Sequence, residues 1–242
     1  YDYSFPTNPT RTSERNMLAL PQPFGIAVNG VLFDPLAAAW YSATSATGWS
    51  MNRADASSGW SVNPLSSLVD LGLDKNGAHV QPSGAYHYHG IPDGLVDEVH
   101  RGKHSPLIGW AGDGFPIYLD RGYRIPKKKG SGVRRLRSSF QLKSGLRPDG
   151  PGGSYDGTFV EDYEYVAGSG DLDESNGRVQ VTPEFPRGAY CYILTRDFPV
   201  IPRSFRGALA SSFVHTGPDR QPPQGGPPDS GPPRRPPRGT GD

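Results

Sequence analysis

The residues best suited to chemistry are histidines gathered in one part of the chain. Five of the six histidines fall within 26 residues, and four of these are the candidates for chemistry: His79, His87, His89 and His104. Two of them alternate with tyrosines in the stretch AYHYHG, residues 85 to 90. On a β-strand successive side chains point to opposite faces, so His87 and His89 should share one face. Tyr86 and Tyr88 should then pack on the other face.

A third imidazole can join this pair through a hairpin. His79 precedes Pro82-Ser83-Gly84, a sequence typical of a tight turn, so it should face His87 and His89 across an antiparallel ladder. Three converging imidazoles with no thiolate nearby favour Cu(II) or Zn(II). Water, His104 or a carboxylate would complete the coordination sphere.

Two other interpretations of the histidines stay open. They can satisfy one another by hydrogen bonds as a structural cluster, or act directly in acid-base catalysis. Nucleophilic chemistry has less support, because no G-x-S-x-G elbow occurs. The single cysteine, Cys191, lies in the apolar pattern AYCYIL, where we expect an inert buried thiol and no intrachain disulfide.

A weaker metal candidate is the acidic stretch GSGDLDESNGR, residues 168 to 178. Asp171, Asp173 and Asn176 put hard oxygen ligands on a tight turn, which is the chemistry that calcium prefers. The spacing does not match an EF-hand loop, so a plain acidic turn is the alternative.

The elements that must position these residues are predicted to be β-strands. Between residues 24 and 213 many short apolar alternations are separated by turn dipeptides such as Asn29-Gly30 and Asp113-Gly114. We expect a mainly β fold, an antiparallel β-sandwich-like single domain. One short helix each is predicted over residues 35–43 and 64–73.

An extended N-terminal arm, residues 1–23, precedes this body. Tyr1, Tyr3 and Phe5 alternate with polar residues as in a strand, and a proline-containing polar stretch separates them from the body. The arm is either a frayed terminus or a strand that completes the sheet of another subunit.

A tail rich in proline and glycine, residues 214–242, follows the body. Its last 26 residues hold nine Pro and six Gly, a composition that forms polyproline II or stays disordered. The sequence has no usable Asn-x-Ser/Thr site, since Pro9 blocks the one at Asn8, so any glycan would be O-linked.

Composition and charge exclude some classes of function. The formal net charge is +1, which gives no reason to expect nucleic acid as a partner, and no apolar run is long enough to span a membrane. The chain also has two charged blocks, a basic one over residues 124–143 and an acidic one over residues 149–174. Each block is either solvated on its own or attracted to the other.

A chain that starts at Tyr1 fits a mature product without its signal peptide, or an incomplete N-terminus.

Several motifs in one order resemble the YHYH-domain family of secreted proteins. They are NGAHVQP, GAYHYHG, HSPLIGWAGDGFPIY, PGGSYDGTFVEDYEYVAGSGDLDESNGR and TPEFPRGAYCYILTRDFPVIPRSFRG. The resemblance covers residues 21 to 207 and leaves the arm and the tail outside. It implies an extracellular or cell-surface β-rich domain without an established reaction.

The chain departs from this family pattern at two positions. Family members often carry cysteines in the segments that here read LDESNGR and IPRSFRG, where this chain has Ser175 and Ser204. If those cysteines pair, the chain lacks a disulfide, and oligomer contacts or a bound ion should hold the two segments together.

These features lead to two main hypotheses of function. In the first, the protein is a secreted structural subunit that polymerises head-to-tail into an extracellular filament by inserting its arm into a neighbour, with O-linked glycans on the tail. In the second, it is an extracellular metal-binding protein or metal-dependent enzyme that uses the histidines. A carbohydrate-binding module is a third class, suggested only by aromatics that are more often core residues: Trp40, Tyr41, Trp49, Trp60 and Trp110.

Overall fold

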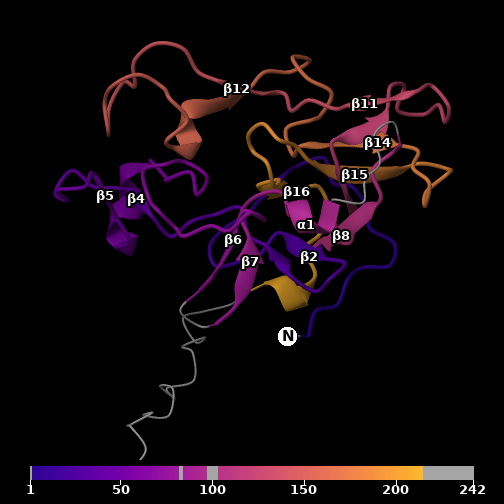
Figure 1. Ribbon diagram of the computed structural model, residues 1–242, viewed down its shortest axis with the longest axis horizontal. Coiled ribbons are helices and arrows are strands. Elements are labelled where there is room, and N and C mark those ends of the chain that lie inside the picture. The colour runs from indigo at the N-terminus through magenta and orange to yellow at the C-terminus, as the bar shows by residue number, and fades with distance from the viewer. Residues whose placement is uncertain (1, 82–83, 97–102, 215–242) are drawn as a thin grey trace, which may run out of the picture.

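The computed structural model describes residues 2–81, 84–96 and 103–214, which form a mainly β fold (Figure 1). Its largest unit is an eight-stranded sheet in the order β14-β15-β9-β8-β2-β3-β7-β6. Its strands are Gly25–Ala27 (β2), Leu32–Phe33 (β3), Ala78–Val80 (β6), Tyr86–Tyr88 (β7), Leu107–Ala111 (β8), Pro116–Leu119 (β9), Gly177–Gln180 (β14) and Ala189–Leu194 (β15). Most neighbours are antiparallel, which confirms the predicted fold class, while β15 with β9 and β3 with β7 are parallel.

The described residues also form four two-stranded sheets. They pair β1 with β16, β4 with β5, β10 with β11 and β12 with β13. Their strands are Asn16–Met17 (β1), Trp40–Tyr41 (β4), Trp49–Ser50 (β5), Arg121–Tyr123 (β10), Val133–Arg135 (β11), Phe140–Leu142 (β12), Tyr163–Tyr165 (β13) and Ser204–Phe205 (β16).

The helices are short and lie elsewhere than predicted. The described residues form one α-helical turn, Asp93–Val96 (α1), and the 3₁₀ turns Arg53–Ser58 (η1), Val160–Asp162 (η2) and Ser211–Phe213 (η3). The helices predicted over 35–43 and 64–73 are wrong, because Trp40 and Tyr41 pair with β5 and the second segment forms turns and bends. None of the helices in the described ranges is long and apolar enough to cross a membrane.

The core lies on both faces of the strands β9 and β15. Ile117 and Tyr192 pack into a cluster on one face, and Tyr118 and Ile193 pack into another on the opposite face. Cys191 is buried in this second cluster, in agreement with the expected inert thiol. A third cluster buries Trp60 beside Phe159, so this tryptophan is a core residue rather than part of a binding surface.

The basic and acidic blocks meet within the chain. Arg134 of β11 donates from Nη1 to Asp171 Oδ2 at 2.8 Å and makes a second contact with the other carboxylate oxygen. The mutual attraction that the sequence left open therefore occurs inside one subunit, at a partly exposed ion pair.

The N-terminal arm lies along the body of its own chain. The rings of Tyr3 and Phe5 lie 4.5 and 5.3 Å from that of Phe213, and Asn16 and Met17 pair with β16. Leu18 is buried in the main core. Tyr1 and the tail from residue 215 lie outside the described residues, as does any glycan on that tail.

Candidate metal centre

Three histidines are brought together by the neighbouring strands β6 and β7. These strands lie side by side near the centre of Figure 1, and their antiparallel register sets His79 opposite His87. His89 follows β7 at two residues from His87 and therefore points to the same face. The predicted convergence of His79, His87 and His89 is confirmed.

A close approach of two glycines fixes the position of His89. Gly77 has a φ of +62°, and a Cβ added there would lie 2.7 Å from the Gly90 Cα. This close packing lets the Gly77 carbonyl accept hydrogen bonds from the backbone N–H groups of His89 and Gly90, at 2.8 and 2.9 Å. A side chain at residue 77 would separate the two strands and move His89 out of place.

The three imidazoles meet through the same ring nitrogen. The Nε2 atom of His89 lies 2.9 Å from that of His87 and 3.2 Å from that of His79. Among the residues that the structure describes, they are the one group of three metal-ligating His, Cys, Asp or Glu side chains. His87 and His89 are buried, whereas His79 is half-buried and marks the side open to solvent.

Backbone carbonyls determine which ring nitrogen of His79 and of His87 carries no proton. The Nδ1 atom of His79 lies 2.7 Å from the Leu71 carbonyl, and that of His87 lies 3.2 Å from the Ala85 carbonyl. A carbonyl only accepts, so both Nδ1 atoms carry the proton and both Nε2 atoms present a lone pair to the common centre. Metal-ligating histidines are oriented in the same way.

The environment keeps the ligands neutral. Burial lowers the pKa of His87 below its ordinary value and lowers that of His89 to about 3, with the neighbouring imidazoles adding to the effect. Neutral imidazole is the form that binds a metal, so a lowered pKa keeps these two ligands ready at neutral pH.

A cluster without a metal leaves one buried nitrogen unsatisfied. A proton on His89 Nε2 could be shared between His79 and His87, but it leaves His89 Nδ1 as a buried acceptor with no hydrogen-bond partner. The backbone of Asp34 favours a proton on the His89 ring, although Nδ1 has no hydrogen-bond partner among the described residues. With the proton on Nδ1, three Nε2 lone pairs face each other, which a cation relieves.

The fourth candidate histidine lies outside this centre. His104 packs against the rings of Tyr118 and Tyr123, at centroid distances of 5.6 and 4.8 Å, and its Nδ1 lies 2.8 Å from the Ser105 carbonyl. The structure therefore does not bring it to the group of three. The tyrosines of the motif have packing roles, with Tyr88 in the main core.

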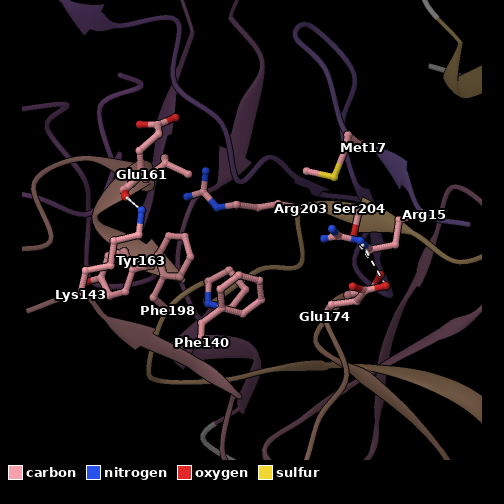
Figure 2. A pocket seen from close by; sticks show the side chains of 13 residues that line it. Arg15, Met17, Phe140, Lys143, Glu161, Tyr163, Glu174, Phe198, Arg203 and Ser204 are labelled. Atoms are coloured by element: carbon pink, nitrogen blue, oxygen red, sulfur yellow. Dashed lines mark hydrogen bonds and ion pairs between the residues drawn. The ribbon is translucent and has the colours of Figure 1, made fainter. Parts of the chain in front are cut away.

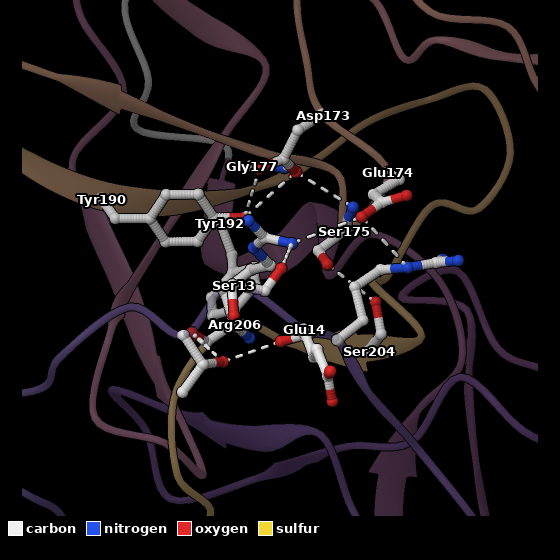
Figure 3. A network of polar contacts seen from close by, with 12 residues as sticks. Ser13, Glu14, Asp173, Glu174, Ser175, Gly177, Tyr190, Tyr192, Ser204 and Arg206 are labelled. Atoms are coloured by element: carbon white, nitrogen blue, oxygen red, sulfur yellow. Dashed lines mark hydrogen bonds and ion pairs between the residues drawn. The ribbon is translucent and has the colours of Figure 1, made fainter.

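The acidic turn does not gather its oxygen atoms around one point. Asp171 binds Arg134, while Asp173 accepts hydrogen bonds from the backbone of Ser175 and Gly177 and from the Tyr190 hydroxyl (Figure 3). The Asn176 side chain donates to the Ile193 carbonyl. Asp171 and Asp173 are thus engaged by separate partners, whereas Asn176 Oδ1 is buried without a hydrogen-bond partner. Among the described residues the two carboxylates do not belong to a group of three metal-ligating side chains.

Figure 3 also shows what holds the two segments where the resemblance placed cysteines. The hydroxyl oxygens of Ser175 and Ser204 lie 2.8 Å apart in a buried hydrogen bond. A direct contact within one chain therefore joins these segments.

Sequence reasoning missed the carbonyls that orient the histidines and a buried arginine. Leu71, Ala85 and Asp34 act through their backbone, which carries no side-chain signal. Arg203 follows a proline in IPRSFRG, within the motifs that carry the resemblance, and sequence analysis gave it no role.

Comparison with known proteins agrees with the motifs. A model of the family described as YHYH protein matches residues 2–207, so the match includes the arm that sequence analysis had placed outside it. No curated protein and no solved structure matches the chain. With most of its length covered by this match, the chain belongs to the YHYH family.

Proposed function

We propose that the protein binds a transition-metal ion, Cu(II) or Zn(II), through His79, His87 and His89. The observation that carries the proposal is the convergence of three Nε2 atoms, two of them on rings whose Nδ1 is held by a backbone carbonyl. Nitrogen ligands without a thiolate favour these two metals. The rings would spread slightly to admit the ion, because a metal–nitrogen bond is about 2.0–2.1 Å long.

Three protein ligands leave room for a water molecule or a substrate. In zinc enzymes the bound ion acts as a Lewis acid at such a position. Here that position would face the half-buried side of His79, since His87 and His89 are enclosed. We place the protein outside the cell as part of the same proposal, in line with the family resemblance.

Metal titration of protein treated with a chelator tests this function. We expect one equivalent of Zn(II) or Cu(II) per chain and a free energy of unfolding raised by about 2.7 kcal/mol at a metal concentration of 100 Kd. His87→Gln should abolish high-affinity binding, because it removes a buried ligand. His104→Gln is the matched control and should bind like the unchanged protein. Uptake of less than about one-tenth of an equivalent would contradict the proposal.

A second candidate function is a structural one, favoured by the packing of the arm. Tyr3 and Phe5 pack against Phe213, and the Ser4 backbone N–H donates a hydrogen bond to the Ser212 hydroxyl. The end of the described body therefore offers a binding site for an aromatic arm. The arm of a second copy can replace the chain's own arm at this binding site. Repeated exchange of arms links subunits head-to-tail into an extracellular filament. The edge strands β6 and β14 are further places for strand addition.

Deletion of residues 1–6 tests the filament. We expect electron micrographs of the intact protein to show polymers, and the shortened protein to remain a folded monomer. Tyr3→Ala with Phe5→Ala should act like the deletion, while Asp2→Ala, an exposed change, should leave polymers intact. Sedimentation of the intact protein only as a monomer at micromolar concentration would refute this function.

A further inference from the structure

A pocket of about 300 Å³ lies apart from the three histidines (Figure 2). One wall comes from the arm, through Arg15 and Met17, and the opposite wall from η2 and β13. Arg203 and Ser204 at β16 and the Phe198-Pro199 turn close the remaining sides. The pocket is at the small end of the range for ligand sites.

Arg203 brings unused hydrogen-bond donors to this pocket. Its Nε and Nη1 atoms are buried and have no hydrogen-bond partner among the described residues. Figure 2 shows its guanidinium reaching between Glu161 and the rings of Tyr163 and Phe198. A buried donor without a partner is costly, and each one in a native protein calls for an explanation. A ligand with acceptor oxygens would supply the missing hydrogen-bond partner.

The other charged groups of the pocket are already engaged. Lys143 donates to the Glu161 carbonyl at 2.8 Å, and Arg15 pairs with Glu174 at 3.3 Å. The Glu161 carboxylate accepts from the Ser61 backbone N–H at 2.7 Å. Its charge and that of Asp34 act on Arg203 without a hydrogen bond, so the guanidinium keeps its donors free.

The rest of the lining is apolar and aromatic. Tyr163 and Phe198 stack with ring centroids 3.9 Å apart and planes 2° from parallel, and Phe140 packs edge-on against Phe198. The Arg203 guanidinium lies over the Phe198 ring at 5.0 Å, which holds it in place. A ligand that fits this lining has an apolar body and a single anionic end.

We propose that this pocket binds a small carboxylate with an aromatic or branched aliphatic body. The planar guanidinium of Arg203 matches a carboxylate and can bind both of its oxygens. The aromatic wall formed by Phe140, Tyr163 and Phe198 packs against the apolar body. None of the three clustered histidines lines this site.

Ligand-observed NMR and calorimetry with defined probes test the proposal. The probes are 3-phenylpropionate and 4-methylpentanoate, each compared with its neutral amide. We expect saturable binding of at least one acid and a Kd at least about tenfold higher for its amide, because the amide lacks the charge that Arg203 recognises. Binding of acid and amide with equal affinity, or of neither acid, would overturn the proposal.

Three variants separate recognition from loss of fold. Arg203→Gln should weaken binding of the acid by at least about tenfold, whereas Arg53→Gln, at an exposed site away from the pocket, should not. Met17→Trp narrows the pocket with Arg203 intact and should also weaken binding, since Met17 is 62% exposed and tolerates the change. Unchanged affinity in both pocket variants would refute this assignment.

Discussion

Replacing Arg147 by alanine should lower the free energy of unfolding by about 3–5 kcal/mol, because it breaks a buried ion pair. The Arg147 side chain is 6% exposed and that of Asp162 is fully buried. Nε and Nη2 of Arg147 each lie 2.8 Å from one of the Asp162 carboxylate oxygens, and Nη1 donates to the Gly152 carbonyl. The variant leaves the Asp162 carboxylate enclosed with no cation to compensate it.

Urea unfolding followed by fluorescence measures this loss. Arg15→Ala is the matched control, because Arg15 pairs with Glu174 at a site where both side chains are about one-third exposed. Such exposed pairs contribute at most about 1 kcal/mol. An equal loss of stability in the two variants would show that the Arg147 pair has no special role.

Introducing cysteines at positions 175 and 204 should raise the free energy of unfolding by about 3.5 kcal/mol in the oxidised protein. The two serine hydroxyls already lie 2.8 Å apart, and the longer C–S bonds bring sulfur atoms towards the 2.03–2.05 Å of a disulfide. The bond would close a loop of about 30 residues, and the entropy of the unfolded chain falls with it.

Comparison of the oxidised and reduced double variant measures the gain directly. Burial raises the pKa of the Cys191 thiol to about 12, so this native cysteine should not compete for the new bond. Ser175→Cys alone is the control and should show no difference between oxidising and reducing conditions. Failure of Ser175→Cys/Ser204→Cys to oxidise would mean that the two backbones are farther apart than their hydroxyls indicate.

The sequence predicted the histidine centre because its geometry is local. Alternation on one strand and a short hairpin connection suffice to put His79 opposite His87, and the register agrees. The parallel pairing of β3 with β7 was not foreseen, because it depends on segments far apart in the chain. The filament and the metal stay predictions of this sequence.

The two misplaced helices show how tertiary contacts override local pattern. Trp40 and Tyr41 have the strand propensity of aromatic residues and pair with β5 once Trp60 and Phe159 offer a core to pack on. In residues 64–73 the chain forms turns and bends, and the Leu71 carbonyl lies against the Nδ1 atom of His79. Tertiary contacts of this kind commonly override the helix propensity of a short segment.

The pairing of β1 with β16 has a kinetic consequence. Asn16 pairs with Phe205, Phe33 with Tyr88 and Tyr192 with Ile117, so the strands join residues that are distant in sequence. Folds dominated by such contacts close their loops slowly, in milliseconds to seconds. During synthesis the first strand must wait until residue 205 has emerged, so this sheet cannot close any earlier.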